Sequence, residues 1–441
     1  MEKFIIKGGK RLKGEVSVSG SKNVALKALV AACLTDEKVI IENIPLISDF
    51  MVMAEIIRDL GGTVVIRDHK AEVWVKKFKN NRIPFSKAAQ IRTSSMFLAP
   101  LLARTNEAII PNPGGCRIGA RPIDRIIKGL KKMGARISYN SKDGYFHAKT
   151  NNLLGTTYRF DKNTHTGTET LILSAVLAKG KTVLENAACE PEIDQLIELL
   201  NKMGARIKRV SIRTIIIDGV EKLHGTTFRI RSDRNEIITF AIAALITEGD
   251  VLIKGAEDAD LLSFLKMLKK TGAGFEKKKD GIRFYSSNNL LQTQVTTSNH
   301  PGFMTDWQGP WAVLMTKAKG ESIIHETVYE NRFGYVGELL RMGANIEYFN
   351  PIVKDVKATY NFNTKDDKKE YLHAIKIYGE TDLHNAVLTI SDLRAGATLV
   401  LAALAARGES VVFGVEHLDR GYEKFEQRLK KLGAQIKRVV V

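Results

Sequence analysis

The chain has 441 residues, of which 44% are hydrophobic, and it carries a formal charge of +18 at pH 7. A chain of this length exceeds what one hydrophobic core usually spans, so we expect two domains. The sequence has no run of about 18 apolar residues, the length that a membrane-spanning helix needs, so we expect no membrane insertion.

The large positive charge raises the question of a nucleic-acid partner. The lysines are scattered along the chain, and a dense run such as 277–279 is short and followed by the turn signal Asp280-Gly281. A base-stacking surface has aromatic side chains interleaved with its basic residues, and these lysine runs lack them. We therefore expect no nucleic-acid partner, and we expect the excess charge to steer a small anionic substrate.

The first residues, 1–7, are charged and strand-like and do not form an apolar signal segment. The chain has three cysteines, an odd number that argues against a disulfide framework. Together these features predict a cytoplasmic protein. Cys33 lies in an apolar run and Cys189 follows Ala187-Ala188, so both are expected to be structural.

One sequence phrase recurs six times along the chain: a helix end that runs into glycine, a small residue and then a strand. A glycine in this place suits the left-handed residue that ends a helix. Successive copies lie 68 to 73 residues apart, except the last, which follows after 90; the glycines are Gly61, Gly134, Gly204, Gly272, Gly343 and Gly433.

Helices that are apolar nearly all round alternate with this phrase, for example at 171–178 and 399–406. Such helices must be buried. Each unit has roughly 70 residues, whereas solenoid repeats usually have about 20–50. We therefore predict two α/β domains of three units each, in which three buried helices lie under three sheets, with the break between domains near 231–234.

The stretch 111–122, Pro-Asn-Pro-Gly-Gly-Cys-Arg-Ile-Gly-Ala-Arg-Pro, is the strongest functional signal. It places Cys116 among glycines and between Arg117 and Arg121. Glycines free the backbone to move, and nearby positive charge favours the thiolate. The pattern predicts a mobile loop whose reactive thiol faces an anion; the alternative is a solvent loop with an incidental cysteine.

Six motifs, taken in chain order, resemble those of the UDP-N-acetylglucosamine 1-carboxyvinyltransferases. These enolpyruvyl transferases carry out the first committed step of peptidoglycan precursor synthesis. The resemblance covers essentially the whole chain, and the cysteine loop and the Asp-Leu-Arg-Ala element are specific to it, whereas the shikimate-pathway enolpyruvyl transferase shares the six units. The motifs are residues 19–23, 113–122, 305–306, 330–333, 391–395 and 419–423.

The resemblance implies a two-domain inverted α/β barrel of six βαβαββ-type units, with the active-site cleft between the domains. The chain would cross twice, so that 22–231, with the mobile loop 111–122, forms one domain and 1–21 plus 232–441 the other. It also implies the reaction, in which the enolpyruvyl group of phosphoenolpyruvate moves to the 3-hydroxyl of UDP-N-acetylglucosamine by addition and elimination. Phosphate is released, and no metal or cofactor takes part.

By resemblance, Lys22, Arg121 and Arg394 would hold phosphoenolpyruvate, with Arg92 as a further contact on the phosphate side. Without the resemblance, each of these residues is more often a surface charge. Lys22 nevertheless lies where a strand leads into a helix, and helix N-termini favour anions. Arg394 follows Asp392 before a buried helix, which suggests a pinned guanidinium.

By resemblance, Asp306 would be the base at the sugar hydroxyl. A helix cap is the alternative, compatible with that role, because Thr305-Asp306 precedes an apolar helix that starts near Trp307. Cys116 would supply or relay the proton to phosphoenolpyruvate, and it corresponds to the thiol that fosfomycin alkylates in the family. Some relatives place an aspartate there.

For the nucleotide sugar, Asn23, the run Arg121-Pro122-Ile123-Asp124 and Val328 match contact positions of the family. Glu190 and Glu192 are expected to support the site without taking part in catalysis.

Three stretches depart from the family pattern. Thr164-His165-Thr166-Gly167 stands where Ser-Val-Gly is common, Trp307 follows a site sequence that has lost a proline, and Glu236 stands near a usual Thr-Gly pair. These departures leave the acceptor selectivity open. The alternatives are an enolpyruvyl transferase for another hydroxyl acceptor, a non-catalytic UDP-sugar-binding paralogue, and an RNA-end cyclase, whose histidine adenylation motif we do not find.

Overall fold

The computed structural model describes residues 2–115, 118–287 and 289–440. This part of the chain forms two compact units, of which unit 1 comprises residues 2–19, 118–121 and 232–440, and unit 2 comprises 20–115 and 122–231. The domain ranges expected from the resemblance stay a prediction. The two units differ from them at residues 20–21, which lie in unit 2, and at 118–121, which lie in unit 1.

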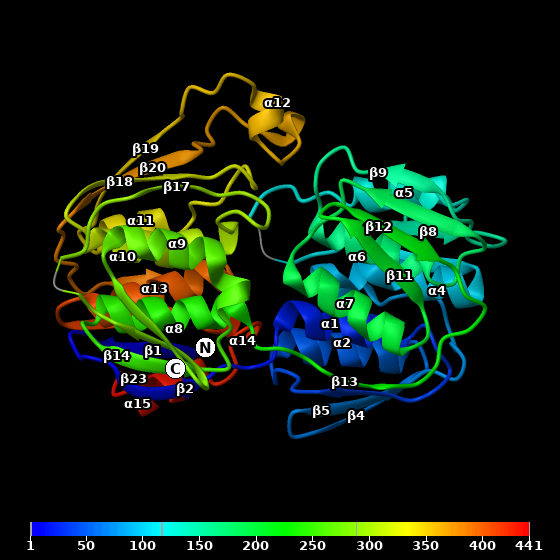
Figure 1. Ribbon diagram of the computed structural model, residues 1–441, viewed down its shortest axis with the longest axis horizontal. Helices are drawn as coiled ribbons and strands as arrows, with labels where there is room; N and C mark the ends of the chain where they lie inside the picture. The colour runs from blue at the N-terminus through cyan, green and yellow to red at the C-terminus, as the bar shows by residue number, and fades with distance from the viewer. Residues whose placement is uncertain (1, 116–117, 288, 441) are drawn as a thin grey trace. The chain divides into compact units, whose positions relative to one another are not determined.

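Unit 1 contains three four-stranded sheets (Figure 1). Strand β1 (Glu2–Lys7) pairs antiparallel with both β22 (Glu409–Phe413) and β23 (Gln435–Val440), so the first strand completes a sheet made by the last strands. The fourth strand of this sheet is β21 (Val387–Thr389), beside β22. The second sheet contains, in order, β15 (Gly274–Lys278), β16 (Gly281–Tyr285), β14 (Asp250–Lys254) and β2 (Lys13–Ser17). The third contains, in order, β17 (Gln294–Thr296), β18 (Gly320–His325), β20 (Ala374–Gly379) and β19 (Asn345–Phe349).

Unit 2 also contains three sheets, with the same mixed pattern of one short parallel strand and an antiparallel hairpin. In sheet order they are β11 (Arg206–Ser211), β12 (Thr214–Asp218), β10 (Lys181–Glu185) and β9 (Thr157–Arg159); β13 (Thr227–Arg229), β3 (Val39–Glu42), β5 (Lys70–Trp74) and β4 (Thr63–Arg67); and β6 (Glu107–Pro111), β8 (Tyr145–Lys149) and β7 (Arg136–Asn140). In the last sheet, a parallel bridge between Arg82 and Ile109 takes the place of the short strand.

Each unit has a core of three helices whose residues are mostly buried, as the sequence predicts. In unit 1 these helices pack against one another pairwise: α8 (Arg234–Ile246), α10 (Gln308–Thr316) and α13 (Leu393–Ala405). Their counterparts in unit 2 are α1 (Lys22–Ala32), α4 (Leu98–Thr105) and α6 (His165–Ala175). Buried apolar side chains form one separate core in each unit, so the expected arrangement of three helices and three sheets is confirmed.

A second set of six helices bears an apolar face on one side only, and each ends at a glycine of the repeated phrase. The set is α2 (Ser48–Asp59), α5 (Asp124–Lys132), α7 (Pro191–Lys202), α9 (Leu262–Thr271), α11 (Val336–Arg341) and α15 (Phe425–Lys431). All six glycines have φ between 76° and 101°. This range is left-handed, which confirms the predicted helix ends.

Short elements connect the repeats: α3 (Phe85–Ala88), η1 (Arg92–Phe97), η2 (Asp258–Leu261), η3 (Thr305–Trp307), α12 (Val356–Thr359), η4 (Thr364–Asp366) and α14 (Glu416–Asp419). Among the described residues, the longest helices fall short of the length and apolar character needed to cross a bilayer.

Candidate active site

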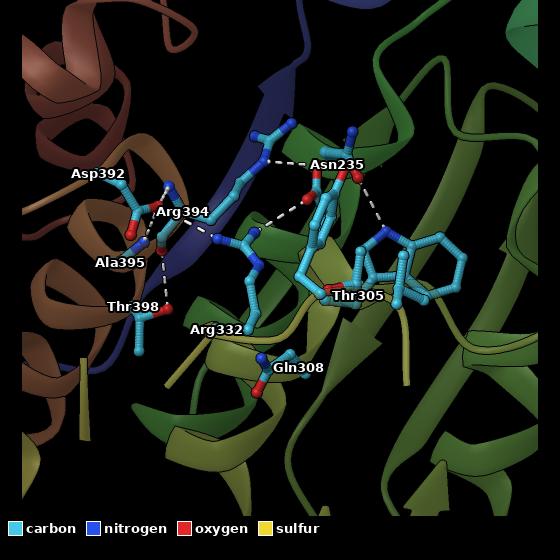
Figure 2. A network of polar contacts seen from close by, with 12 residues as sticks. Asn235, Thr305, Gln308, Arg332, Asp392, Arg394, Ala395 and Thr398 are labelled. Atoms are coloured by element: carbon cyan, nitrogen blue, oxygen red, sulfur yellow. Dashed lines mark hydrogen bonds and ion pairs between the residues drawn. The ribbon is translucent and has the colours of Figure 1, made fainter. Parts of the chain in front are cut away.

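A polar network in unit 1 joins Asp306 to two buried arginines, and Figure 2 shows this network from close by. The carboxylate of Asp306 lies in the turn η3, directly before α10, and accepts two hydrogen bonds from arginines. Arg332 Nη2 donates to Oδ1 at 3.0 Å, and Arg394 Nε donates to Oδ2 at 3.0 Å. The helix-cap alternative is wrong for Asp306, because α10 begins at Gln308 without a side-chain cap.

The charge of Asp306 is set by these neighbours. Burial by itself would raise the pKa of the carboxyl, but the guanidinium groups of Arg394 and Arg332, with a contribution from Arg121, hold the pKa of Asp306 well below its usual range. The residue is therefore a carboxylate at neutral pH.

Arg394 is pinned, as expected, although Asp392 does not hold its guanidinium. Asp392 caps α13 and accepts from the backbone N–H groups of Arg394 at 3.0 Å and Ala395 at 3.2 Å (Figure 2). The guanidinium instead donates to Asp306 and, from Nη1, to the hydroxyl of Tyr422 at 3.1 Å. The cap fixes the backbone of Arg394 at the start of α13, and the hydrogen bonds to Asp306 and Tyr422 fix the position of its guanidinium.

Arg332 belongs to the same network, and the sequence reasoning did not assign it to the site. It lies between β18 and α11, is 6% exposed, and pairs with both Asp306 and Asp392, the latter at 3.4 Å. The signal was the Glu330-Asn331-Arg332-Phe333 motif, which marked the family without indicating a role for the arginine. The structure places it in direct contact with the predicted base.

The departures near Asp306 and in α8 are accommodated by buried hydrogen bonds. Trp307 is 1% exposed, and its Nε1 donates to Oδ1 of Asn235 at 2.9 Å. Glu236 accepts two hydrogen bonds from Arg428, at 2.7 and 2.8 Å. The residues that differ from the usual pattern therefore join the packing of unit 1.

The described end of the cysteine loop contacts the segment that contains Val328. The backbone N–H of Ala120 donates to Oε1 of Glu330 at 2.5 Å. The guanidinium of Arg121 lies over the ring of Tyr329, 5.7 Å from its centroid. Arg121, Val328 and Asp306 therefore belong to one neighbourhood of unit 1, whereas Cys116 and Arg117 lie outside the described residues.

The remaining predicted site residues belong to unit 2. Lys22 is the first residue of α1, as expected from its place before an apolar run, and Asn23 follows it. The Nζ atom of Lys22 lies 2.7 Å from Oδ2 of Asp49, and the side chains of Lys22 and Asp49 are both buried. The sequence did not indicate this carboxylate partner.

Arg92 and the run that follows the cysteine loop come together at the start of α5. Arg92 Nη2 donates to the carbonyl oxygen of Pro122 at 3.1 Å. Ile123 is the N-cap residue of α5, and Asp124 is its first helical residue. Arg92, Pro122, Ile123 and Asp124 thus form a second local group, built at the entrance to one helix.

His165 begins α6, whose N-cap residue Thr164 accepts from the backbone N–H of Gly167 at 3.2 Å. The Nε2 atom of His165 lies 3.2 Å from Oε1 of Glu169, and Lys27 Nζ lies 3.3 Å from Oε2 of the same carboxylate. Burial opposes the charged imidazole, but the carboxylate of Glu169 outweighs it and raises the pKa of His165. Glu190 and Glu192, at the start of α7, are buried in the same unit.

Comparison of the sequence with known proteins shows which family the chain belongs to. Residues 6–429 match the family of EPSP synthase (3-phosphoshikimate 1-carboxyvinyltransferase). The chain belongs to this family. It is 42% identical over 443 residues to a UDP-N-acetylglucosamine 1-carboxyvinyltransferase of Koribacter versatilis (strain Ellin345), covering 100% of this chain and 97% of the relative. The enzyme of that name from Bartonella henselae is 40% identical over 457 residues, with 100% of both chains covered.

Solved structures support the fold. The enolpyruvyl transferase NikO from Streptomyces tendae superposes with a TM-score of 0.87 at 24% identity, covering 100% of this chain and 99% of that one. An EPSP synthase from Acinetobacter baumannii gives a TM-score of 0.73 at 18% identity, with 100% of both chains covered. These likenesses confirm the two-domain enolpyruvyl transferase fold.

The two described cysteines are buried, as predicted. Cys33 is fully buried, and burial raises its pKa to about 12. Burial also raises the pKa of Cys189, which is 7% exposed. Within the described ranges, no group of three or more His, Cys, Asp or Glu is arranged to hold a metal ion.

Proposed function

We propose that this enzyme transfers the enolpyruvyl group of phosphoenolpyruvate to the 3-hydroxyl of UDP-N-acetylglucosamine and releases phosphate. This reaction is the first committed step of peptidoglycan precursor synthesis. Relatives that are similar along their full length and carry this enzyme's name support the proposal. The carboxylate of Asp306 between Arg332 and Arg394 is the observation on the molecule itself that carries it.

Enolpyruvyl transfer needs cations for a carboxylate and a phosphate, and a base for the sugar hydroxyl. Arg394 supplies a planar guanidinium, which suits carboxylate and phosphate. We assign it to phosphoenolpyruvate, together with Lys22, Arg92 and Arg121. Asp306 is the base.

A carboxylate whose pKa is strongly lowered is a weak base, and we expect substrate binding to raise the pKa of Asp306 again. When the anionic substrate engages Arg394, the positive charge of that guanidinium is shared between the substrate and Asp306. Weaker stabilisation of the carboxylate raises its pKa. Asp306 therefore becomes a stronger base when phosphoenolpyruvate is bound, which is when the hydroxyl must lose its proton.

Cys116 is assigned the proton transfer to the methylene carbon of phosphoenolpyruvate by resemblance to the family, and its glycine-rich, arginine-flanked loop is consistent with a reactive thiol. Asn23, Arg121, Pro122, Ile123, Asp124 and Val328 are assigned to the nucleotide sugar. The cytoplasmic location also stays a prediction.

The test is an assay of phosphate release from phosphoenolpyruvate with UDP-N-acetylglucosamine as the acceptor. We expect release that depends on both substrates and a product whose mass exceeds that of the acceptor by one enolpyruvyl group. The second candidate acceptor is shikimate 3-phosphate, because the matching family includes the enzyme that uses it. Release with that acceptor alone would overturn the proposal, and binding of UDP-N-acetylglucosamine without release would favour a non-catalytic paralogue.

A further inference from the structure

The connection between β19 and β20 is far longer than its counterparts in the other repeats. The matching hairpins β4–β5, β7–β8, β11–β12 and β15–β16 are joined by residues 68–69, 141–144, 212–213 and 279–280. Between β19 and β20 the chain runs through residues 350–373, which include α12 and η4 (Figure 1). This segment, called the insert below, accounts for the longer spacing of the last repeat.

The insert has an aromatic base that packs on the end of β18. Tyr360, Phe362 and His373 are between 4% and 5% exposed. Tyr360 stacks on Phe362 with ring centroids 5.0 Å apart, and Phe362 lies 5.2 Å from His373. The hydroxyl of Tyr360 also lies 3.2 Å from Nε2 of His325, the last residue of β18. A segment with such a buried base is part of the folded structure of unit 1.

Backbone hydrogen bonds join the insert to the residues that follow β18. The N–H of Asn361 donates to the carbonyl oxygen of Thr327 at 2.7 Å, and the N–H of Glu326 donates to the carbonyl oxygen of His373 at 2.8 Å. On its other side, Thr327 donates two hydrogen bonds to Thr297: its backbone N–H to the hydroxyl oxygen at 2.9 Å, and its hydroxyl to the carbonyl oxygen at 2.5 Å. Thr327 is therefore held between the end of β17 and the insert.

Residues 326–330, called the 326–330 segment below, connect this anchor to the site. The carboxylate of Glu326 accepts from the N–H groups of Val328 at 2.7 Å and Tyr329 at 3.0 Å. Its other oxygen accepts from the hydroxyl of Thr305, next to Asp306, at 2.8 Å. Glu330 in turn binds the backbone of Ala120. The segment thus joins the predicted acceptor contact, the turn that contains the base and the described end of the cysteine loop.

We propose that the insert is a positioning element for the 326–330 segment and that it sets the affinity for the nucleotide-sugar acceptor. The inference rests on the proposed function for its kinetic part only. Asn361 is a positioning residue, since its backbone N–H acts through Thr327 on Val328. The insert lies outside the Asp306 network, so the chemical step is not expected to depend on it.

The test compares Asn361→Pro with Asn361→Ala. Proline lacks the N–H that Thr327 accepts, whereas alanine keeps it, so the alanine variant is the matched control. Tyr360 has ψ of 131°, the extended conformation that the residue before a proline prefers, so the backbone of the preceding residue suits the substitution. We expect the KM for UDP-N-acetylglucosamine to rise roughly two- to tenfold in Asn361→Pro, because the loss of one hydrogen bond typically has an effect of this size. In Asn361→Pro, the kcat and the KM for phosphoenolpyruvate should change by less than about twofold, because the Asp306 network keeps its contacts. In Asn361→Ala, all three kinetic parameters should stay within about twofold of the wild type.

Hydrogen exchange without any ligand tests the same idea independently of the acceptor. The backbone N–H groups of the 326–330 segment should exchange faster in Asn361→Pro than in Asn361→Ala or the wild type. If the wild type transfers nothing to UDP-N-acetylglucosamine, the proposed function fails, while the exchange data still decide the role of the insert.

A second variant covers the case in which Asn361→Pro does not fold. Phe349 and Ala374 already face each other in the β19–β20 ladder, so an Asn-Gly turn can replace residues 350–373 without a change of register. This variant should show at least the same rise in acceptor KM and in exchange. Folded variants with wild-type acceptor KM and exchange, or with an equal rise in the KM for phosphoenolpyruvate, would overturn the inference.

Discussion

The Nε–H of Arg394 donates to Oδ2 of Asp306 at 3.0 Å, across 88 positions of the chain. The contact joins the residue assigned to the anionic substrate to the residue assigned as base. It keeps the carboxylate of Asp306 ionised, and under the proposed function the pKa of Asp306 rises when the anionic substrate binds Arg394.

Replacing Asp306 by asparagine should abolish most of the turnover while preserving the shape of the side chain. The amide cannot take the proton of the sugar hydroxyl, and loss of a general base typically costs about 10²- to 10⁴-fold in rate. Phosphate release under saturating substrates measures the effect. Asp382→Asn is the matched control, because its carboxylate pairs with Arg407 on the exposed surface. Wild-type turnover in Asp306→Asn would remove this residue from the mechanism.

The stability contributed by the charge of Asp306 should persist through the neutral range and disappear in acid. The pKa of this carboxyl is lower in the folded than in the unfolded state. Its contribution is therefore complete above the unfolded pKa of about 3.9 and is lost as the pH falls toward the folded value.

Urea unfolding of the wild type and Asp306→Asn at a series of pH values measures this. The difference between their free energies of unfolding should stay constant from about pH 8 to pH 5 and shrink below about pH 4. A difference that already shrinks between pH 7 and pH 5 would show that the arginines do not hold the carboxylate as the structure indicates.

Thiol reagents should modify one of the three cysteines in the native protein. Cys33 is fully buried with its pKa raised to about 12, and burial also raises the pKa of Cys189, so neither provides an accessible thiolate. Cys116 has glycine and arginine neighbours in the sequence. Peptide mass spectrometry after treatment with fosfomycin should locate the adduct on Cys116, and Cys116→Ser should remove it. Labelling of Cys33 or Cys189 before unfolding would contradict the prediction, and unfolded protein treated with iodoacetamide provides the positive control.

The ion pair between Lys22 and Asp49 should matter for both stability and substrate affinity. The pair is buried with the charged atoms 2.7 Å apart. Asp49→Asn removes the negative charge that pairs with a buried ammonium, which we expect to cost about 3–5 kcal/mol. We also expect the KM for phosphoenolpyruvate to rise, because the carboxylate that positions the ammonium is lost.

The matched control for this pair is Glu72→Gln, whose partner Lys38 lies 2.8 Å away on the surface. Exposed pairs contribute about 0–1 kcal/mol, so this variant should unfold almost as the wild type does. Equal losses in the two variants, measured by chemical denaturation, would show that burial of the Lys22 pair has no special effect.

Much of the fold was predictable because it depends on local patterns. The recurring glycines marked helix ends, and all six have the left-handed backbone that such ends require. The apolar runs marked the buried helices, since a helix without a polar face has no side to present to water. The fully buried Cys33 followed from the same reasoning.

The polar contacts were not predictable in this way, because their partners lie far apart in the chain. The sequence suggested Asp392 as the neighbour of Arg394, yet that carboxylate caps the helix and Asp306 holds the guanidinium. Likewise, nothing local indicated that Asn361 would donate to Thr327.

The sequence by itself determined the repeated architecture, the buried helices and the membership of the family, since periodicity and motif order are properties of the chain read in one dimension. The tertiary structure alone decided which charges pair, which arginine joins Asp306 and where the insert makes contact. Hydrophobic patterning reports only whether a residue faces the core. The choice of a hydrogen-bond partner depends on distances of about 3 Å between atoms, which exist only once the sheets and helices have packed.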